Sequence, residues 1–182
     1  MVAEERTLIV LGVTGGIAAY KSAELCSALA QAGETVQVVM TANAQRFVSP
    51  LVFKTLSRRP VLTSLWENEG EWRPEHVAYA AAAKLFVVAP ATANFIAKYA
   101  HGIADDALST FAATYQGPAL LAPAMNPAMW SHPACAENTA VLRRRGVEFV
   151  GPVEGRVACG PAEGPGRLAP VEEILAAIRR LL

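Results

Sequence analysis

The sequence is poor in cysteine and carries no excess of charge. Its three cysteines are an odd number and show no paired spacing, which argues against both a disulfide framework and a cysteine-based metal site. The 16 basic and 16 acidic residues give a formal net charge of zero. No overall field therefore favours nucleic acid or an anionic membrane, and we expect neither as a partner. A bound anion would need a local site.

Long apolar runs are also missing. No segment reaches the roughly 18 consecutive apolar residues that span a bilayer. The N-terminal residues 1–6 include acidic side chains ahead of the first apolar run, which is unlike a signal peptide. We therefore expect a cytoplasmic protein. With 182 residues, 53% of them hydrophobic, the chain fits a single domain over residues 1–182.

Short apolar runs alternate with helical segments along the chain. A continuous apolar run is typical of a strand that is buried on both faces of a parallel sheet, and the run that begins at Leu85 is the clearest example. The alternation predicts an α/β protein with a three-layer α/β/α, flavodoxin-like or Rossmann-like fold around a central parallel sheet. The predicted strands are 7–13, 35–41, 85–90, 118–123 and 146–150.

The segments between these strands carry helical signals. Apolar spacing around Pro50 predicts two helical pieces between Asn43 and Leu56, with Phe47 on an inward face. Residues 61–66 indicate a short strand. Two further helices are expected to end near Gln31 and near Arg145, and another to begin at Pro74. A helix is also expected to begin at Ala104, where aspartates act as caps, and a last helix closes the chain over 171–182.

Polar residues follow two of the predicted strands. Thr92 and Asn94 lie on the loop after the strand that starts at Leu85, at the carboxyl edge where open α/β sheets bind ligands. Asn126 follows the next strand, with Met129 in an apolar wall beside it. Each polar side chain can face a ligand or can cap the helix that follows it, and the sequence leaves both interpretations open.

A glycine turn follows the first strand and bears on the class of cofactor. Gly15 and Gly16 allow close approach of the backbone to a ligand, although such glycines often serve turn geometry alone. A nicotinamide dinucleotide fold would have Gly-x-Gly-x-x-Gly here and an acidic residue after the second strand. The turn instead continues into Ile17, and the second strand ends near Thr41 and Asn43. The pattern favours a mononucleotide.

Two further residues are candidates for proton transfer. His76 lies in the first turn of a predicted helix, where the dipole favours the neutral, proton-accepting imidazole. Cys159 lies in a glycine- and proline-rich segment, 151–170, whose composition is typical of a binding loop or lid. Each also has a plain structural interpretation, as a surface histidine and a loop cysteine.

Together, four separated motifs give the chain a resemblance to a known family. The sequence resembles the homo-oligomeric flavin-containing cysteine decarboxylases, in particular their phosphopantothenoylcysteine decarboxylases, over nearly its whole length. The motifs that carry this resemblance are 13–21, 90–94 with 102–106, 123–130, and 158–160 with 164–167.

The resemblance implies FMN as the cofactor and assigns roles by position. His76 matches the family's active-site base, Asn126 the residue that holds the substrate carboxylate beside Met129, and Cys159 the cysteine that returns a proton. Residues 161–163 differ from the acidic residue usual in the family, and Tyr79 and Lys84 also depart from its pattern. The matched FMN contacts are Gly15, Gly16, Ile17, Thr41, Asn43, Ala91, Thr92, Asn94 and Ala124.

The implied reaction converts 4'-phosphopantothenoylcysteine to 4'-phosphopantetheine in coenzyme A biosynthesis. The substrate thiol is oxidised to a thioaldehyde, carbon dioxide leaves, and the enethiolate is reduced again. The family also implies a trimer, or a dodecamer built of trimers, with the active site between subunits.

Other interpretations of the family resemblance stay open. They are a peptidyl-cysteine decarboxylase, a flavin prenyltransferase, or a non-catalytic FMN-binding regulatory subunit. Bacterial relatives often continue into a synthetase domain, and this chain stops before it. We therefore expect either a monofunctional enzyme, with a separate phosphopantothenate–cysteine ligase as a functional partner, or one half of a longer product.

Overall fold

A parallel sheet forms the centre of the molecule in the computed structural model, which describes residues 7–66, 75–156, 160 and 164–182. Its strand order is β2-β1-β3-β4-β5, and every neighbouring pair runs parallel. The predicted α/β class is confirmed. The strands are β1 (Leu8–Val13), β2 (Thr35–Met40), β3 (Leu85–Ala91), β4 (Ala119–Pro123) and β5 (Glu148–Phe149).

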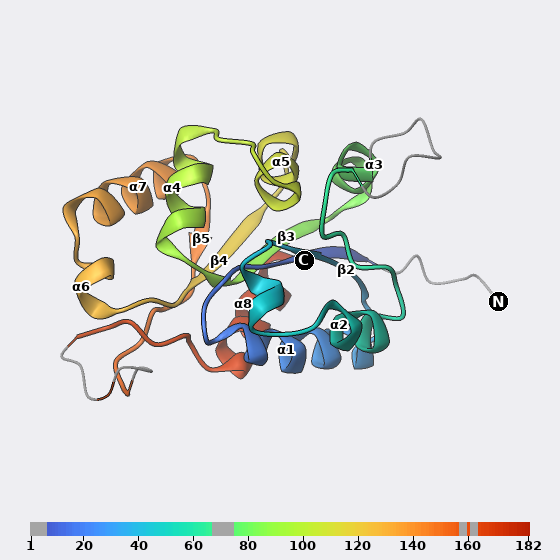
Figure 1. The fold of residues 1–182 in the computed structure, drawn as a ribbon, viewed down its shortest axis with the longest axis horizontal. Helices are drawn as coiled ribbons and strands as arrows, with labels where there is room; N and C mark the ends of the chain where they lie inside the picture. The colour runs from blue at the N-terminus through green and yellow to red at the C-terminus, as the bar shows by residue number, and fades with distance from the viewer. Residues whose placement is uncertain (1–6, 67–74, 157–159, 161–163) are drawn as a thin grey trace.

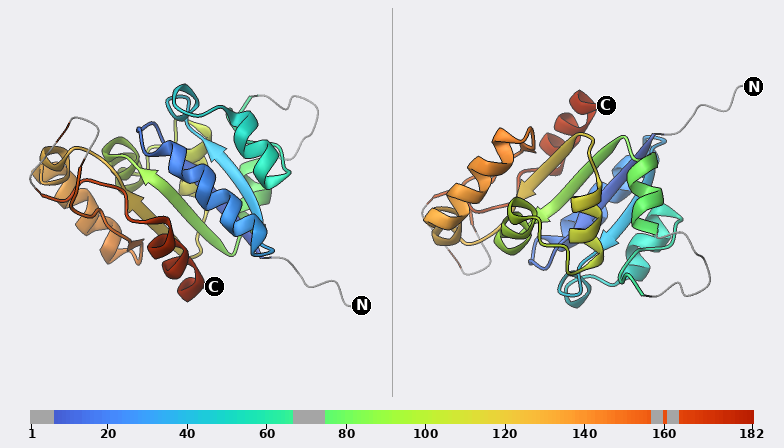
Figure 2. Two further views of the ribbon diagram at one scale, coloured as in Figure 1. Left: turned by 90° about the horizontal axis from the view of Figure 1, so that it is seen from below. Right: turned by 90° about the horizontal axis from the view of Figure 1, so that it is seen from above.

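Helices cover both faces of the sheet and complete three layers (Figures 1 and 2). One face carries α1 (Ala19–Gln31), α2 (Pro50–Ser57) and α8 (Val171–Leu181). The other carries α3 (Glu75–Ala82), α4 (Ala93–His101), α5 (Ala107–Thr114) and α7 (Pro133–Arg144). Two short elements follow β2 and β4, the 3-10 helix η1 (Ala44–Arg46) and α6 (Pro127–Trp130).

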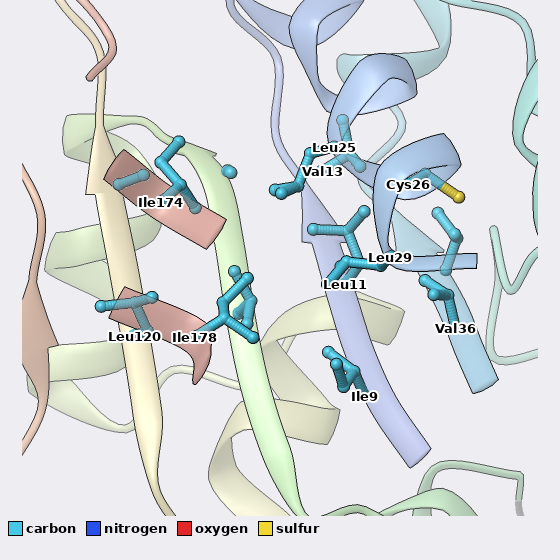
Figure 3. Close-up of a cluster of buried hydrophobic side chains, with 14 of the residues drawn as sticks. Ile9, Leu11, Val13, Leu25, Cys26, Leu29, Val36, Leu120, Ile174 and Ile178 are labelled. Carbon is cyan, nitrogen blue, oxygen red and sulfur yellow. The ribbon is translucent and has the colours of Figure 1, made fainter. Parts of the chain in front are cut away.

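The alternation of side chains along the strands divides the core into two clusters. On β1, Ile9 and Leu11 face α1 and α8, where they join Ile178 (Figure 3), whereas Val10 faces the opposite layer. On β3, Phe86 packs in that opposite layer, where the centroid of its ring lies 5.0 Å from that of Phe111. All residues of β3 are buried, which confirms a central strand that is apolar on both faces.

The segment after β2 forms two helical pieces, η1 and α2, as predicted, but the phenylalanine that it buries is not the predicted one. Phe47 was expected to face inward, but it is 50% exposed, and Phe53 is the fully buried phenylalanine of this region. The reason is the break before Pro50, where Ser49 is extended and its hydroxyl accepts the amide N–H of Leu51. This break separates η1 from α2, so one helical periodicity does not run through both.

One other predicted element is shorter than expected. Of residues 61–66, only Leu62 pairs with β2, through an isolated parallel bridge to Val39 rather than a full strand. The helix expected to end near Arg145 is present as α7, and the short α6 precedes it. Because Pro133 disfavours a helical conformation in the preceding residue, His132 is extended and caps α7 instead of continuing α6.

Candidate active site

A cavity of about 1030 Å³ opens at the carboxyl ends of the strands. Among the described residues, two groups line it. The strand-end wall consists of Gly15, Gly16, Ile17, Thr41, Asn43, Thr92, Asn94 and Ala124. The outer wall consists of Asn126, Met129, Arg156, Arg167 and Leu168. Pockets for drug-sized ligands are usually about 300–1,000 Å³, so this cavity has room for more than one small molecule.

The turn between β1 and α1 brings backbone rather than side chains to the cavity. A Cβ added at Gly15 would overlap the Cβ of Asn43, so this glycine is required for the turn to pack against the end of β2. A Cβ added at Gly16 would lie 3.7 Å from the nearest atom, on Thr92. The N-cap of α1 is Ala18, which offers no side-chain acceptor. The amide N–H groups of Ala19 and Lys21 already donate to the carbonyl oxygens of Gly16 and Ala18. No side chain caps this helix N-terminus, which leaves it accessible to an anionic group.

A buried threonine ties β1 to β3 directly beneath this turn. The hydroxyl of Thr14 donates to the carbonyl oxygen of Pro90 at 2.7 Å and accepts the amide N–H of Thr92 at 3.1 Å. One turn into α1, the hydroxyl of Ser22 donates to the carbonyl oxygen of Ala89. These bonds fix the strand-end wall. Sequence reasoning missed Thr14, although a polar residue at the end of an apolar strand is a usable signal.

The polar residues after β2 and β3 both cap and face the cavity. The hydroxyl of Thr92 accepts the amide N–H of Phe95 and so caps α4. The hydroxyl of Thr41 accepts the amide N–H of Ala44, at the start of η1. Asn94 lies exposed in the first turn of α4. Capping and cavity lining are therefore compatible roles for the threonines.

Asn126 has a geometry that leaves its donors free. Its side-chain oxygen accepts the amide N–H of Ala128 at 2.8 Å, which makes it the N-cap of α6. This bond assigns the oxygen to the helix, so the NH₂ group points away from the α6 backbone. Asn126 is exposed and lines the cavity, and the half-exposed side chain of Met129 stands one turn further along α6. The NH₂ group can bind a carboxylate.

Lys98 and Asp106 also line the cavity, and they form an ion-pair network that sequence reasoning did not find. The ammonium of Lys98 lies 2.6 Å from Asp105 and 3.0 Å from Asp106. Burial alone lowers the pKa of Lys98, but the hydrogen bonds to both carboxylates outweigh it and raise the pKa overall. The hydrogen bond from Lys98 lowers the pKa of Asp105. Asp106 is the N-cap of α5, which confirms the cap predicted there.

Two of the predicted site residues do not line this cavity, and a third lies outside the described residues. His76 is half-buried in the first turn of α3 and is not among the lining residues. Helices α3 and α6 lie at opposite ends of the molecule (Figures 1 and 2), so one chain does not bring His76 to Asn126. Ala91 is fully buried in β3, where its carbonyl oxygen accepts the amide N–H of Ala124. Cys159 lies outside the described residues.

The described cysteines are not reactive groups. Burial raises the pKa of Cys26 to about 11 and also raises the pKa of Cys135. Both thiols are therefore protonated near neutral pH. The described part of the chain contains no cluster of histidine, cysteine, aspartate and glutamate that could hold a metal ion. None of its helices is long and apolar enough to cross a membrane.

Comparison with known families covers nearly the whole chain. The Flavoprotein family model matches residues 2–182. The chain is 47% identical over 167 residues to the coenzyme A biosynthesis bifunctional protein CoaBC of Bacillus subtilis, covering 92% of this chain and 41% of that protein. It is 45% identical to the protein of the same name from Mycolicibacterium smegmatis, covering 97% of this chain and 42% of the relative. The chain thus spans about two fifths of the length of these relatives.

Solved structures share the fold. A cysteine-to-serine mutant of PPC decarboxylase, complexed with pantothenoylaminoethenethiol, matches with a TM-score of 0.87 and 26% identity over 97% of this chain and 98% of that one. The FMN-dependent cysteine decarboxylase SpaF matches with a TM-score of 0.80 and 31% identity over 96% and 97% of the two chains. The FMN-binding protein AtHal3 matches with a TM-score of 0.84 and 26% identity over 97% and 96%.

Proposed function

The chain belongs to the Flavoprotein family, and from this premise we propose that it decarboxylates 4'-phosphopantothenoylcysteine to 4'-phosphopantetheine. The observation that carries the proposal is the single cavity in which an uncapped helix N-terminus and the free amide donors of Asn126 occur together. The first group suits a phosphate and the second a carboxylate. The identity of 47% to a coenzyme A biosynthesis protein supports this substrate class.

Family membership makes a flavin the cofactor class, and we propose FMN. The fit rests on the β1–α1 turn, where Gly16 leaves space beside the backbone and α1 lacks a side-chain cap, as one terminal phosphate requires. Thr41 and Asn43 replace the carboxylate that would hold a dinucleotide ribose. The strand-end wall would hold the group. When bound, a flavin supplies reversible two-electron oxidation of the substrate thiol.

The residues of the outer wall would act on the substrate. We assign the NH₂ group of Asn126 to the substrate carboxylate, which it would orient and hold until carbon dioxide leaves. Met129 would pack against the apolar part of the substrate. Cys159 would return a proton at the end of the reaction, as the family resemblance implies. The segment 151–170 would then serve as a substrate lid on the single FMN-binding domain of residues 1–182.

His76 would act from a neighbouring copy of the chain. Because His76 lies on α3, away from the cavity of its own chain, we propose a homo-oligomer, built of trimers, in which it serves as the base at a neighbour's cavity. A mixture of His76→Asn and Asn126→Asp chains should then regain activity that neither variant shows alone. An active monomer in sedimentation at assay concentrations would contradict the shared site.

The longer relatives bear on the remaining proposals. A phosphopantothenate–cysteine ligase, on the same or a separate chain, would supply the substrate, and the location would be the cytoplasm. A peptidyl-cysteine decarboxylase is the second candidate, because the family resemblance includes that class and the FMN-dependent cysteine decarboxylase SpaF is 31% identical over nearly the whole chain. The outer wall would decide between these two substrates, since the strand-end wall would be common to both.

A direct assay tests the proposed function. FMN-loaded protein is incubated with 4'-phosphopantothenoylcysteine, and the products are identified by mass spectrometry. We expect 4'-phosphopantetheine and carbon dioxide, whereas the serine analogue, which has no thiol to oxidise, should remain intact. A peptide with a C-terminal cysteine serves as the competing substrate. Turnover of the peptide alone would replace the proposal with the second candidate, and turnover of neither would contradict both.

A further inference from the structure

The outer wall carries two arginines to which the proposed reaction gives no role. The cationic side chains among the described lining residues are Lys21, Lys98, Arg156 and Arg167. Lys98 is neutralised by Asp105 and Asp106, and Lys21 lies in the first turn of α1, beside the turn proposed for FMN. The two arginines remain, on the side of the cavity that holds Asn126.

The backbone fixes Arg167 next to Asn126. A Cβ added at the preceding residue, Gly166, would lie 2.5 Å from the carbonyl oxygen of Met125 and 2.9 Å from a side-chain carbon of Pro127. The amide N–H of Met125 also donates to the carbonyl oxygen of Gly166 at 2.9 Å. Only glycine fits this contact, and the contact clamps Arg167 against the segment that contains Asn126.

A second backbone contact pairs Arg167 with the segment that leads to Arg156. Val153 and Arg167 form an antiparallel bridge with N–H···O distances of 2.9 and 3.1 Å. The side chain of Arg167 then lies across Gly155, since a Cβ added there would be 3.2 Å from Arg167 Cδ and 3.3 Å from one of its guanidinium nitrogens. Arg156 follows at once in the chain and lines the same cavity.

No described carboxylate pairs with the positive charge of either arginine. Both side chains are exposed, and neither forms an ion pair with a described carboxylate, whereas Lys98 and Arg180 do. Guanidinium groups bind phosphate through two parallel N–H···O bonds, which a single ammonium does not offer. The outer wall therefore presents two phosphate-binding groups to the cavity that are unpaired among the described residues.

We propose that Arg156 and Arg167 bind the terminal phosphate of the substrate and so select phosphorylated pantothenoylcysteine over its unphosphorylated form and over peptides. This inference rests on the proposed function and adds a specificity determinant to it. The strand-end wall would hold the phosphate of FMN, and the arginines would hold the second phosphate at the other side of the cavity. Arg167 would be the stronger determinant, because two backbone contacts fix its position.

Paired substrates test the inference. The FMN-loaded wild type, Arg167→Gln, Arg156→Gln and Arg167→Lys are compared for kcat/KM on phosphopantothenoylcysteine and on pantothenoylcysteine. Arg144→Gln is the matched control, because Arg144 is exposed on α7 and does not line the cavity. We expect Arg167→Gln to lose about 10- to 100-fold on the phosphorylated substrate alone, as for a hydrogen bond to a charged group. Arg167→Lys should recover part of this loss, and Arg144→Gln should change neither value.

Two outcomes separate the inference from the function on which it rests. Wild-type turnover with no preference for the phosphate, or with a preference that survives both glutamine variants, would overturn the inference and leave the decarboxylase activity intact. No turnover of either compound by the wild type would overturn the proposed function and the inference with it. The FMN dissociation constant is measured in parallel. If the glutamine variants weaken FMN instead, the arginines serve the cofactor phosphate and the inference is wrong.

Discussion

The strand-end wall of the cavity is held by hydrogen bonds between buried strands, whereas the outer wall consists of exposed side chains apart from the buried Leu168. Thr14, only 1% exposed, joins β1 to β3 through two hydrogen bonds. By contrast, Asn126, Met129, Arg156 and Arg167 are all exposed. The difference indicates that one wall is preorganised, as the proposed FMN site requires, while the other would vary with the substrate under the proposed function.

The largest expected effect comes from filling the glycine turn of the strand-end wall. In Gly15→Val the side chain would overlap the Cβ of Asn43, so the turn and the end of β2 must separate. We expect purified protein with no bound flavin and no turnover, as measured by visible absorbance and by product analysis. Gly16→Ala is the folding control, because its Cβ has space, and it should keep the wild-type unfolding temperature. A yellow, active Gly15→Val protein would show that this wall does not hold the cofactor.

A smaller but more selective effect is expected in the outer wall. Asn126→Asp keeps the N-cap of α6, since aspartate caps as well as asparagine does, but it replaces two donors with a carboxylate that repels the substrate. We expect kcat/KM to fall on the order of 100-fold or more, with FMN retained. Steady-state kinetics and a flavin titration measure the two quantities. Equal losses in kcat/KM and in FMN binding would show that the two walls do not have separate roles.

The smallest effect concerns the Lys98 network at the border between the walls. The pKa of Asp105 is lowered in the fold, so its contribution to stability is present above its usual value of 3.8 and is lost as the pH falls through the lower, folded pKa. The pKa of Lys98 is raised, so its contribution is present up to 10.5 and is lost as the pH rises through the higher, folded pKa.

Lys98→Met should therefore lower the unfolding temperature by at most a few degrees near neutral pH, because the pair is partly exposed. The difference from the wild type should shrink toward both ends of the pH range. Lys54→Met, at an exposed site on α2, is the control. Thermal unfolding followed by circular dichroism across pH measures the difference, and a difference independent of pH would assign it to packing rather than to charge.

Local sequence signals predicted the strand-end wall better than the outer wall. The apolar run from Leu85 and the cap at Thr92 are each determined by neighbours in the chain, so periodicity and residue type suffice. The glycine turn was also recognised from residue type, although the contact that requires Gly15 is a tertiary one with Asn43. The contact of Gly166 with Met125 and the position of Arg167 over Gly155 join segments through tertiary packing. No local pattern contains that information. The wrong prediction for Phe47 has the same origin, because the interruption between η1 and α2 changed which phenylalanine faces the core.

The two-wall account is tested most directly by the FMN dissociation constant measured across variants of both walls. Apoprotein of the wild type, Gly15→Val, Asn126→Asp and Arg167→Gln is titrated with FMN, and the quenching of flavin fluorescence is followed. We expect Gly15→Val alone to weaken FMN binding, with the two outer-wall variants within about twofold of the wild type, which is less than 0.5 kcal/mol. Equal weakening in Asn126→Asp or Arg167→Gln would show that the outer wall holds the cofactor and would contradict the account.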